Sequence, residues 1–365
     1  MSRRDSFKNG YTLLELLVVI VIASLLVGIA IPAFQGILAS SRRSLAESKL
    51  QQALYAARDA ATASVGGGDA AAVFFFEPGR GVRVLTCIEV GSIEDDVPGG
   101  LVGPGGGGAL SRRDVFVPLP GFEPVQMPNG IGVRGFALGT LFSGESLWYE
   151  DLETTNPNTV PPEPGYWVFP ETGFYEADLL DTGAVRQTFM VRFTAGEGTI
   201  SREPTRALIL SPSTSGDDAV RDLSSVNASI RDLDEVDDLE LWTRRVLTNT
   251  SVTDVQRLQI FGNESVHTVL AGPVAELSLY QERDLARAVG ARGLNQDTGT
   301  LYLPSDEEPE LDDRLYGGNL RQLARNASRW IEGRPLVNPP GPRTDSTAQI
   351  FSVNAFFGDL VEITR

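Results

Sequence analysis

Carboxylates are the most abundant chemically active side chains of this chain. Its 365 residues include 48 aspartates and glutamates against 31 lysines and arginines, for a formal net charge of −17. The acidic segment 217–241 contains Asp232, Asp234 and Asp237, whose oxygens could bind a hard cation such as calcium. The segment lacks the glycine of an EF-hand loop, and a solvated acidic surface also accounts for it. We therefore expect no metal or other cofactor, with calcium as the open alternative.

The residues on which nucleophilic and metal catalysis usually depend are nearly absent. The chain has one histidine, His267, and no nucleophile-elbow motif lies near it. The single cysteine, Cys87, excludes an internal disulfide and a cysteine-rich zinc site, and its alternating surroundings favour a buried core thiol. The glycine run 103–108 lacks the flanking strand and helix of a phosphate-binding loop. We expect the protein not to be an enzyme.

One further carboxylate, Glu15, lies where a charge is costly. From Leu13 to Phe34 it is the only charged residue, and Ser24 is the only other polar one. As a helix these residues would extend about 33 Å, enough to cross a hydrocarbon core of about 30 Å. The basic leader 1–10 predicts that the N-terminus stays in the cytoplasm and that the body is exported. A carboxylate in a membrane helix costs on the order of 2.5–3.5 kcal/mol at mid-membrane and usually has a partner.

The run Gly10-Tyr11-Thr12-Leu13-Leu14-Glu15, followed by apolar residues and Pro32, resembles the N-terminal signal of type IV pilins and type II secretion pseudopilins. Counted from Tyr11, Glu15 is the fifth residue and Pro32 the twenty-second, as in that family. The resemblance implies that a prepilin peptidase cleaves after Gly10 and that the new amine of Tyr11 is methylated. It also implies that Glu15 neutralises the terminal ammonium of a neighbouring subunit, and that Pro32 distorts the helix.

Beyond Pro32 the pattern predicts that the helix continues to about residue 65, with a bend at the proline. Its second half carries small and apolar residues at spacings of three and four, which indicates one buried face. Gly66, Gly67 and Gly68 then end the helix. The buried face is expected to consist of Ala46, Leu50, Ala53, Leu54, Ala57 and Ala61.

After the glycines the pattern changes to strands. Alternating or apolar runs predict strands at 72–76, 82–88, 114–117, 124–127, 131–138, 188–193 and 206–210. The order of a long helix, the segment ARDAATAS and late strands resembles the GspH/FimT minor-pseudopilin domain over residues 44–211, with longer loops. The expected fold class is α+β: a pilin-like long N-terminal helix packed on an antiparallel β-sheet body.

The rest of the chain, residues 212–365, reads as a long C-terminal extension. Helices are predicted at 237–247, 281–289 and 319–331, and strands at 274–280 and 350–353. The expected domains are a leader 1–10, an N-terminal helix 11–65 with a transmembrane part 11–34, a β-rich domain 66–211 and an acidic mixed α/β extension 212–365. An addition to one domain and a second small domain both fit the extension.

These features favour a structural subunit, most simply a minor one, of a type II secretion pseudopilus or type IV pilus. Cleavage would remove three cations and one anion, leaving 28 − 47 = −19. The expected partners are the prepilin peptidase, other subunits and the inner membrane, which the chain crosses once with its body in the periplasm before it enters the filament. A DNA-binding competence pilin is a second reading, but the acidic charge opposes binding to nucleic acid. A membrane-anchored hydrolase that uses carboxylates alone is a third.

Overall fold

The computed structural model of the protein describes residues 13–64, 67–77, 81–95, 111–138, 165–168, 170, 187–201, 207–210, 236–253, 256–257, 268–289, 320–338 and 345–363. The chain divides into two compact units, Met1–Leu45 and Ala46–Arg365. Helix α1 (Leu13–Ala63) begins in the first unit and ends in the second. All the strands belong to the second unit.

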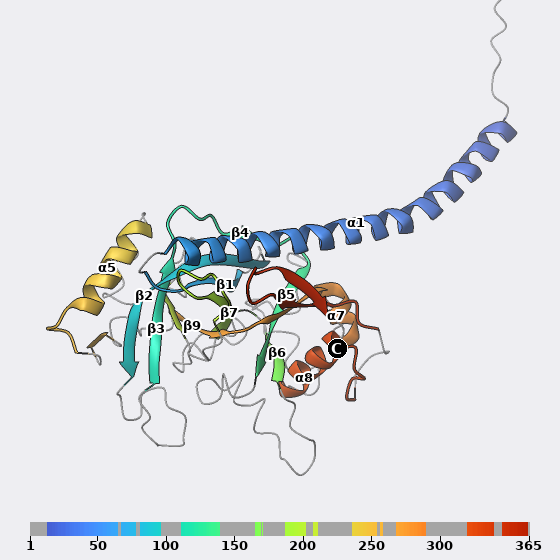
Figure 1. Ribbon diagram of the computed structural model, residues 1–365. Coiled ribbons are helices and arrows are strands. Elements are labelled where there is room, and N and C mark those ends of the chain that lie inside the picture. The colour runs from blue at the N-terminus through green and yellow to red at the C-terminus, as the bar shows by residue number, and fades with distance from the viewer. Residues whose placement is uncertain are drawn as a thin grey trace, which may run out of the picture. The chain divides into compact units, whose positions relative to one another are not determined.

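Six strands of the second unit close into a barrel (Figure 1). Four of the six pairings are antiparallel, and two, β3–β8 and β7–β9, are parallel. A short strand, β4 (Val125–Gln126), pairs with β2 outside the ring. The ring follows the order β1 (Ala70–Glu77), β7 (Gln187–Phe193), β9 (Thr268–Pro273), β8 (Ala207–Leu210), β3 (Ser111–Pro118) and β2 (Gly81–Asp95).

The sequence of β1 suits a strand that is buried on both faces. Ala71, Val73 and Phe75 belong to an apolar cluster to which all six barrel strands contribute, the barrel interior. The alternate residues Phe74 and Phe76 belong to the main core outside the barrel. Because successive side chains of a strand point to opposite faces, a strand buried on both faces must be apolar throughout. The uninterrupted run AAAVFFF meets that requirement.

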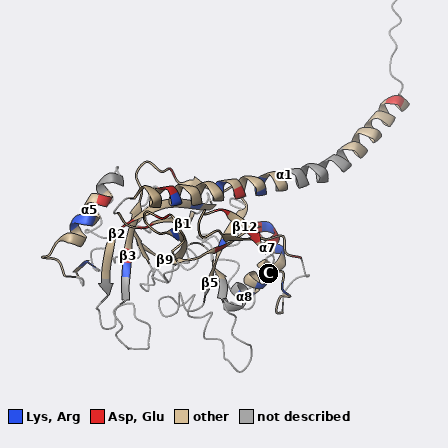
Figure 2. Cartoon of the chain, in the orientation of Figure 1, with Lys and Arg blue, Asp and Glu red and all other residues tan. Residues whose placement is uncertain are grey.

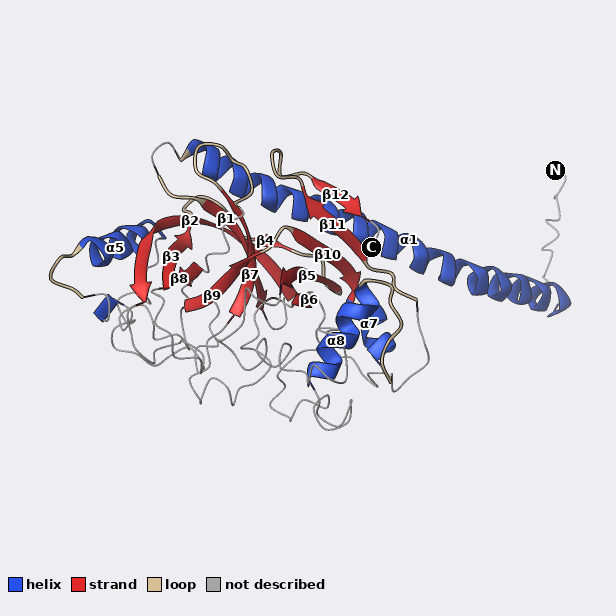
Figure 3. Cartoon of the chain, turned by 60° about the horizontal axis from the view of Figure 1, so that its bottom comes forward, coloured by secondary structure: helices blue, strands red, loops and turns tan. Residues whose placement is uncertain are grey.

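A second, fully antiparallel sheet lies beside the barrel core. Its strands follow the order β12 (Leu360–Ile363), β11 (Gln349–Val353), β10 (Glu276–Gln281), β5 (Ile131–Leu138) and β6 (Gly165–Val168). Leu277 and Leu279 of β10 belong to the main core, whereas Tyr280 packs with helices α7 (Glu282–Val289) and α8 (Leu320–Ile331). Figure 3 shows these two helices side by side at that end of the sheet.

The second half of α1 packs on the barrel and the second sheet through its predicted face. All six predicted residues, 46, 50, 53, 54, 57 and 61, are buried, and they share one apolar core with β1, β7, β10 and β11. Lys49, on another side of the helix, donates from its Nζ to the carbonyl oxygen of Gln126 at 2.5 Å. The spacing of small residues therefore identified the packed face correctly. Elsewhere, helix α5 (Val236–Thr248) packs through Leu239 on the outer side of β2 and β3.

The α+β class and the long N-terminal helix are confirmed, but the body differs from the expected antiparallel sheet. Two barrel pairings are parallel and the ring is closed. Strands β9 to β12 come from residues after 211. Of these, β9 lies between β7 and β8, and β10 pairs with β5, so both join strands from the earlier part of the chain. A period-two pattern identifies a strand but not its neighbour, and this is why the pattern missed these pairings.

Candidate functional site

Of the residues predicted to direct processing and assembly, Gly10, Tyr11 and Glu15 come at or before the start of α1, and Pro32 lies within the helix. Glu15 lies in the first turn of the helix, and its side chain is exposed. A carboxylate there interacts favourably with the positive end of the helix dipole. The helix continues through Pro32. Gly10 and Tyr11, between which cleavage is expected, lie outside the described residues.

The described part of α1 that follows Glu15 is uncharged as far as Ser41 (Figure 2). Several of its large side chains, among them Leu16, Val19 and Leu25, are more than half exposed. Apolar surface of this kind favours association with other apolar groups. No helix in the described part of the chain combines the length and apolar content that a membrane crossing requires.

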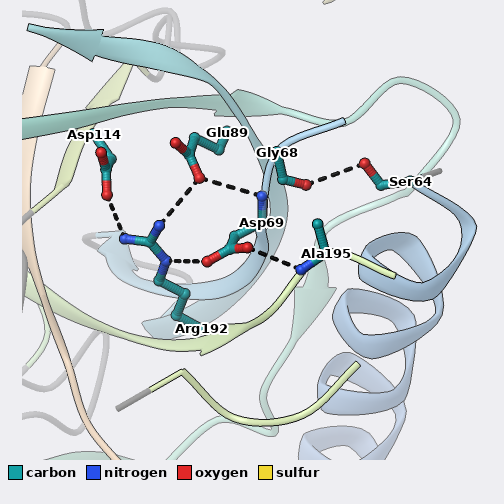
Figure 4. A network of polar contacts seen from close by, with 7 residues as sticks. All are labelled: Ser64, Gly68, Asp69, Glu89, Asp114, Arg192 and Ala195. Carbon is teal, nitrogen blue, oxygen red and sulfur yellow. Dashed lines mark hydrogen bonds and ion pairs between the residues drawn. The ribbon is translucent and has the colours of Figure 1, made fainter. Parts of the chain in front are cut away.

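A separate group of charges lies inside one end of the barrel (Figure 4). Arg192 of β7 binds three carboxylates that come from three other places in the ring. Its Nε donates to Asp69 Oδ2 at 2.7 Å, its Nη1 to Asp114 Oδ2 at 2.6 Å and its Nη2 to Glu89 Oε2 at 3.1 Å. The guanidinium also lies over the ring of Phe116, 5.3 Å from its centroid.

Backbone groups complete this cluster, which we call the Arg192 cluster: Asp69, Glu89, Asp114 and Arg192. The Asp69 amide donates to Glu89 Oε2 at 3.2 Å, and the Glu89 amide donates to the Asp69 carbonyl at 2.8 Å. Asp69 Oδ1 accepts a hydrogen bond from the amide of Ala195 at 2.8 Å. Asp69 directly precedes β1 and Ala195 follows β7, so these bonds join the ends of neighbouring strands.

The Arg192 cluster combines one guanidinium with three carboxylates, and all four side chains are largely buried. The Arg192 side chain is 4% exposed. Burial, and then the charge of Asp114, raises the pKa of Glu89. Since all three carboxylates bind the same guanidinium, the arrangement suits a cross-link between strands better than acid–base chemistry. Among the residues that the structure describes, no group of three or more His, Cys, Asp or Glu could hold a metal ion.

The Arg192 cluster was missed from the sequence, although a signal was present. Arg192 interrupts the apolar strand Phe189-Met190-Val191-Arg192-Phe193, and Asp114 precedes the run Val115-Phe116-Val117. A charge within a strand that is otherwise apolar on both faces requires a buried partner. Of the three candidate calcium ligands, Asp232 and Asp234 lie outside the described residues, and Asp237 lies in α5.

A second buried ionic group lies between the second sheet and α7. Arg134 of β5 donates from Nε to the Tyr280 hydroxyl and from Nη1 to the Trp167 carbonyl, both at 3.1 Å. Glu282, at the start of α7, is buried, and its Oε2 accepts no hydrogen bond within the described part of the chain. Burial raises the pKa of Glu282 to about 8, although Arg134 nearby acts to lower it. Cys87 is buried in the barrel, as expected, and burial raises the pKa of its thiol.

Comparison with known proteins identifies the N-terminus alone. Residues 6–31 match the family described as the prokaryotic N-terminal methylation motif. The match includes Gly10, Tyr11 and Glu15, and confirms a prepilin-type cleavage and methylation segment. No curated protein and no solved structure matches the chain. The resemblance of residues 44–211 to the GspH/FimT domain is thus not supported, since the family match ends at residue 31.

Proposed function

We propose that the protein is a structural subunit of a type II secretion pseudopilus or type IV pilus, without enzymatic activity of its own. The match of residues 6–31 to the N-terminal methylation motif carries this proposal. A prepilin peptidase of the inner membrane cleaves after Gly10, and the amine of Tyr11 is methylated. The segment 11–34 holds the subunit in the inner membrane, with the body in the periplasm, until the subunit enters the filament.

Glu15 has an assembly role in this proposal. Its carboxylate lies in the first turn of α1, next to exposed leucine and valine side chains. In the apolar core of a filament, an isolated carboxylate and an isolated ammonium are each costly, and their pairing offsets part of that cost. Glu15 of one subunit and the Tyr11 amine of its neighbour form such a pair, which sets the register between subunits.

The size and charge of the body support a minor position in the filament. The chain beyond α1 is large and, after cleavage at Gly10, the whole subunit carries −19. Bulky acidic bodies repel one another and hinder close helical stacking of many copies. A few copies at or near the tip avoid that repulsion. The same charge opposes binding to nucleic acid.

The direct test is the mass of the mature N-terminal peptide, measured on protein from its native membrane. We expect a peptide that begins at Tyr11 and carries one added methyl group. The variant Gly10→Val should accumulate the uncleaved precursor, whereas the neighbouring Asn9→Ala should be cleaved normally. An N-terminus at Met1 or Ser2 in the unaltered protein, or normal cleavage of Gly10→Val, would contradict the proposal.

A further inference from the structure

Two tight turns of the second unit, 194–199 and 354–359, share a pair of main-chain hydrogen bonds, although they differ at the third position, where Gly196 has φ 75° and Phe356 has no positive φ. Each has a glycine in the left-handed region at its fifth position, Gly198 with φ 63° and Gly358 with φ 70°. The first follows β7, and the second joins β11 to β12. In the first turn, the Thr194 N–H donates to the Thr199 carbonyl (2.7 Å) and the Gly198 N–H donates to the Thr194 carbonyl (2.9 Å). In the second turn, the Asn354 N–H donates to the Asp359 carbonyl (2.8 Å) and the Gly358 N–H donates to the Asn354 carbonyl (2.9 Å).

Both turns pack on the second half of α1 and on each other. Turn 194–199 donates from the Gly196 amide to the Ala61 carbonyl at 2.8 Å. In turn 354–359, the Gly358 carbonyl accepts a hydrogen bond from the side-chain Nε2 of Gln51 at 3.0 Å. The Ile200 amide donates to the Ala355 carbonyl at 2.9 Å, which joins the two turns directly. Main-chain bonds and the Gln51 side chain therefore hold the two turns in place on this face.

The two turns differ in the side chains at their tips. Turn 354–359 carries Phe356 and Phe357, which are 68% and 59% exposed. Turn 194–199 has Gly196 and Glu197 at the same two places, both exposed. The first turn shows that the shared bonds form without aromatic residues. The amides of Phe356 and Phe357 also donate to Asn354 Oδ1, at 2.9 and 3.2 Å, so the aromatic tip is held in place.

Exposed aromatic residues on a rigid tip are the usual anchors of protein interfaces. Aromatic side chains contribute a large buried area and lose little conformational freedom when they bind. Tyr55 of α1 is 41% exposed and hydrogen-bonds to Asp359 of the same turn, so it extends the aromatic surface onto the helix. Three carboxylates, Glu197, Asp59 and Asp359, lie on the two turns or on α1, and Arg58 of α1 lies against both turns, at Gly198 and Gly358.

We propose that Phe356 and Phe357 insert into an apolar pocket, bordered by lysine or arginine, on a protein of different sequence. The proposal rests on the proposed function, in which that protein is a neighbouring subunit of the filament. The three carboxylates outnumber Arg58 there, and with the charge of −19 that remains after cleavage at Gly10 they favour a basic partner. They oppose a second copy of this chain, which is equally acidic, and an anionic membrane surface.

The experiment places the photoreactive amino acid benzoylphenylalanine at position 356 or 357 of the full chain in its native cells. A matched protein carries it at position 241, where Leu241 of α5 is exposed on a helix that packs on β2 and β3. Crosslinked products are identified by mass spectrometry, and the captured protein is purified. Its affinity for the purified full-length chain in detergent is then measured against the variant Phe356→Ser/Phe357→Ser, at low and high salt.

We expect positions 356 and 357, but not 241, to capture one protein of different sequence. The double variant should bind it at least about 10-fold more weakly, in line with the loss of an interface anchor. High salt should weaken the binding of the unaltered chain. An unchanged melting temperature of the variant, whose substituted side chains are exposed, shows that its fold is intact.

The proposal is overturned if the crosslink goes to a second copy of the chain or to lipid, or if neither position forms one. It is also overturned if the captured protein binds the double variant as tightly as the unaltered chain. Failure of the proposed function would be seen separately, since the mass of the mature N-terminus reports on cleavage and does not depend on residues 356 and 357.

Discussion

At the residue scale, Glu282 is a buried carboxylate near the buried Arg134. Its Oε2 accepts no hydrogen bond within the described part of the chain. Arg134 instead donates to the Tyr280 hydroxyl and the Trp167 carbonyl. Burial dominates the ionisation of Glu282 and raises its pKa to about 8. The folded protein therefore favours the protonated form of this side chain, whereas the unfolded chain ionises it near its ordinary value of 4.5.

This shift predicts how stability depends on pH. A carboxyl group whose pKa is raised by folding stabilises the folded state fully below its unfolded pKa, and the contribution is lost as the pH rises through the folded pKa. Between pH 5 and pH 9 we expect Glu282 to lower the unfolding free energy by on the order of 3–5 kcal/mol. Glu282→Gln, which stays neutral, should remove this loss and be the more stable protein at pH 9.

Denaturant unfolding at pH 5, 7 and 9 measures the effect. Glu123→Gln is the matched control, because Glu123 is an exposed glutamate and its variant should follow the unaltered protein at every pH. Parallel pH profiles for Glu282→Gln and the unaltered chain would show that Glu282 is ionised in the folded state.

At the scale of elements, the Arg192 cluster links four parts of the barrel at once. The backbone hydrogen bonds between strands link only two neighbouring strands at a time. Arg192 lies on β7, Glu89 on β2 and Asp114 on β3, and Asp69 leads into β1. Strands β7 and β3 are not neighbours in the ring, so the bond from Arg192 to Asp114 crosses the interior. The charges thus stabilise the closed form of the barrel at one end.

We expect Arg192→Met to destabilise the protein by about 3–5 kcal/mol, because it leaves buried carboxylates without their cation. Arg192→Lys should recover only part of the loss, since one ammonium cannot bind three carboxylates in the geometry of a guanidinium. Thermal and denaturant unfolding of both variants measure the difference. An equal stability of Arg192→Met and the unaltered protein would mean that the carboxylates bind protons at little cost when the cation is removed.

The helices of the body were predicted more accurately than its strands. The helices expected at 237–247, 281–289 and 319–331 occur as α5, α7 and α8, within one residue at each end. The strand expected at 274–280 was wrong in part, because β9 ends at Pro273 and β10 begins at Glu276. The strands β6, β9 and β12 were not predicted. Of these, β6 and β12 have four residues each and lie at the edges of the second sheet, where alternation is hard to recognise.

At the scale of the whole molecule, the assembly segment and the body belong to different compact units. Glu15 lies in the first unit, and the barrel and second sheet lie in the second. A change at Glu15 should therefore leave the fold of the body intact. The proposed filament role predicts that the same change abolishes assembly, because the neighbouring Tyr11 amine loses its counter-charge.

We expect Glu15→Ala to be cleaved and stable but nearly absent from filaments. Its amount in the filament fraction should be at least about 10-fold below that of the unaltered protein. Filaments sheared from cells and probed by immunoblot give the measurement. Glu47→Ala is the matched control, since Glu47 is an exposed glutamate of the same helix, in the second unit. Normal incorporation of Glu15→Ala would remove the proposed pairing of Glu15 with the Tyr11 amine.

The sequence by itself determined the features that depend on residues close together in the chain. The spacing of Gly10, Tyr11 and Glu15 identified the processing segment, and the spacing from Ala46 to Ala61 identified the buried face of α1. The first rests on the resemblance of this local spacing to the prepilin signal, and the family match bears it out. The second follows from helix geometry, in which neighbours three or four residues apart share a face.

Only the tertiary structure decided the closure of the barrel, the partners of Arg192 and the placement of the two turns. Arg192 meets carboxylates 78, 103 and 123 positions away in the chain. Gln51 contacts the turn at Gly358, 307 positions away. Many strand orders would satisfy the same alternating patterns, and the choice among them depends on how all the faces are buried together. Local spacing carries no information about that choice.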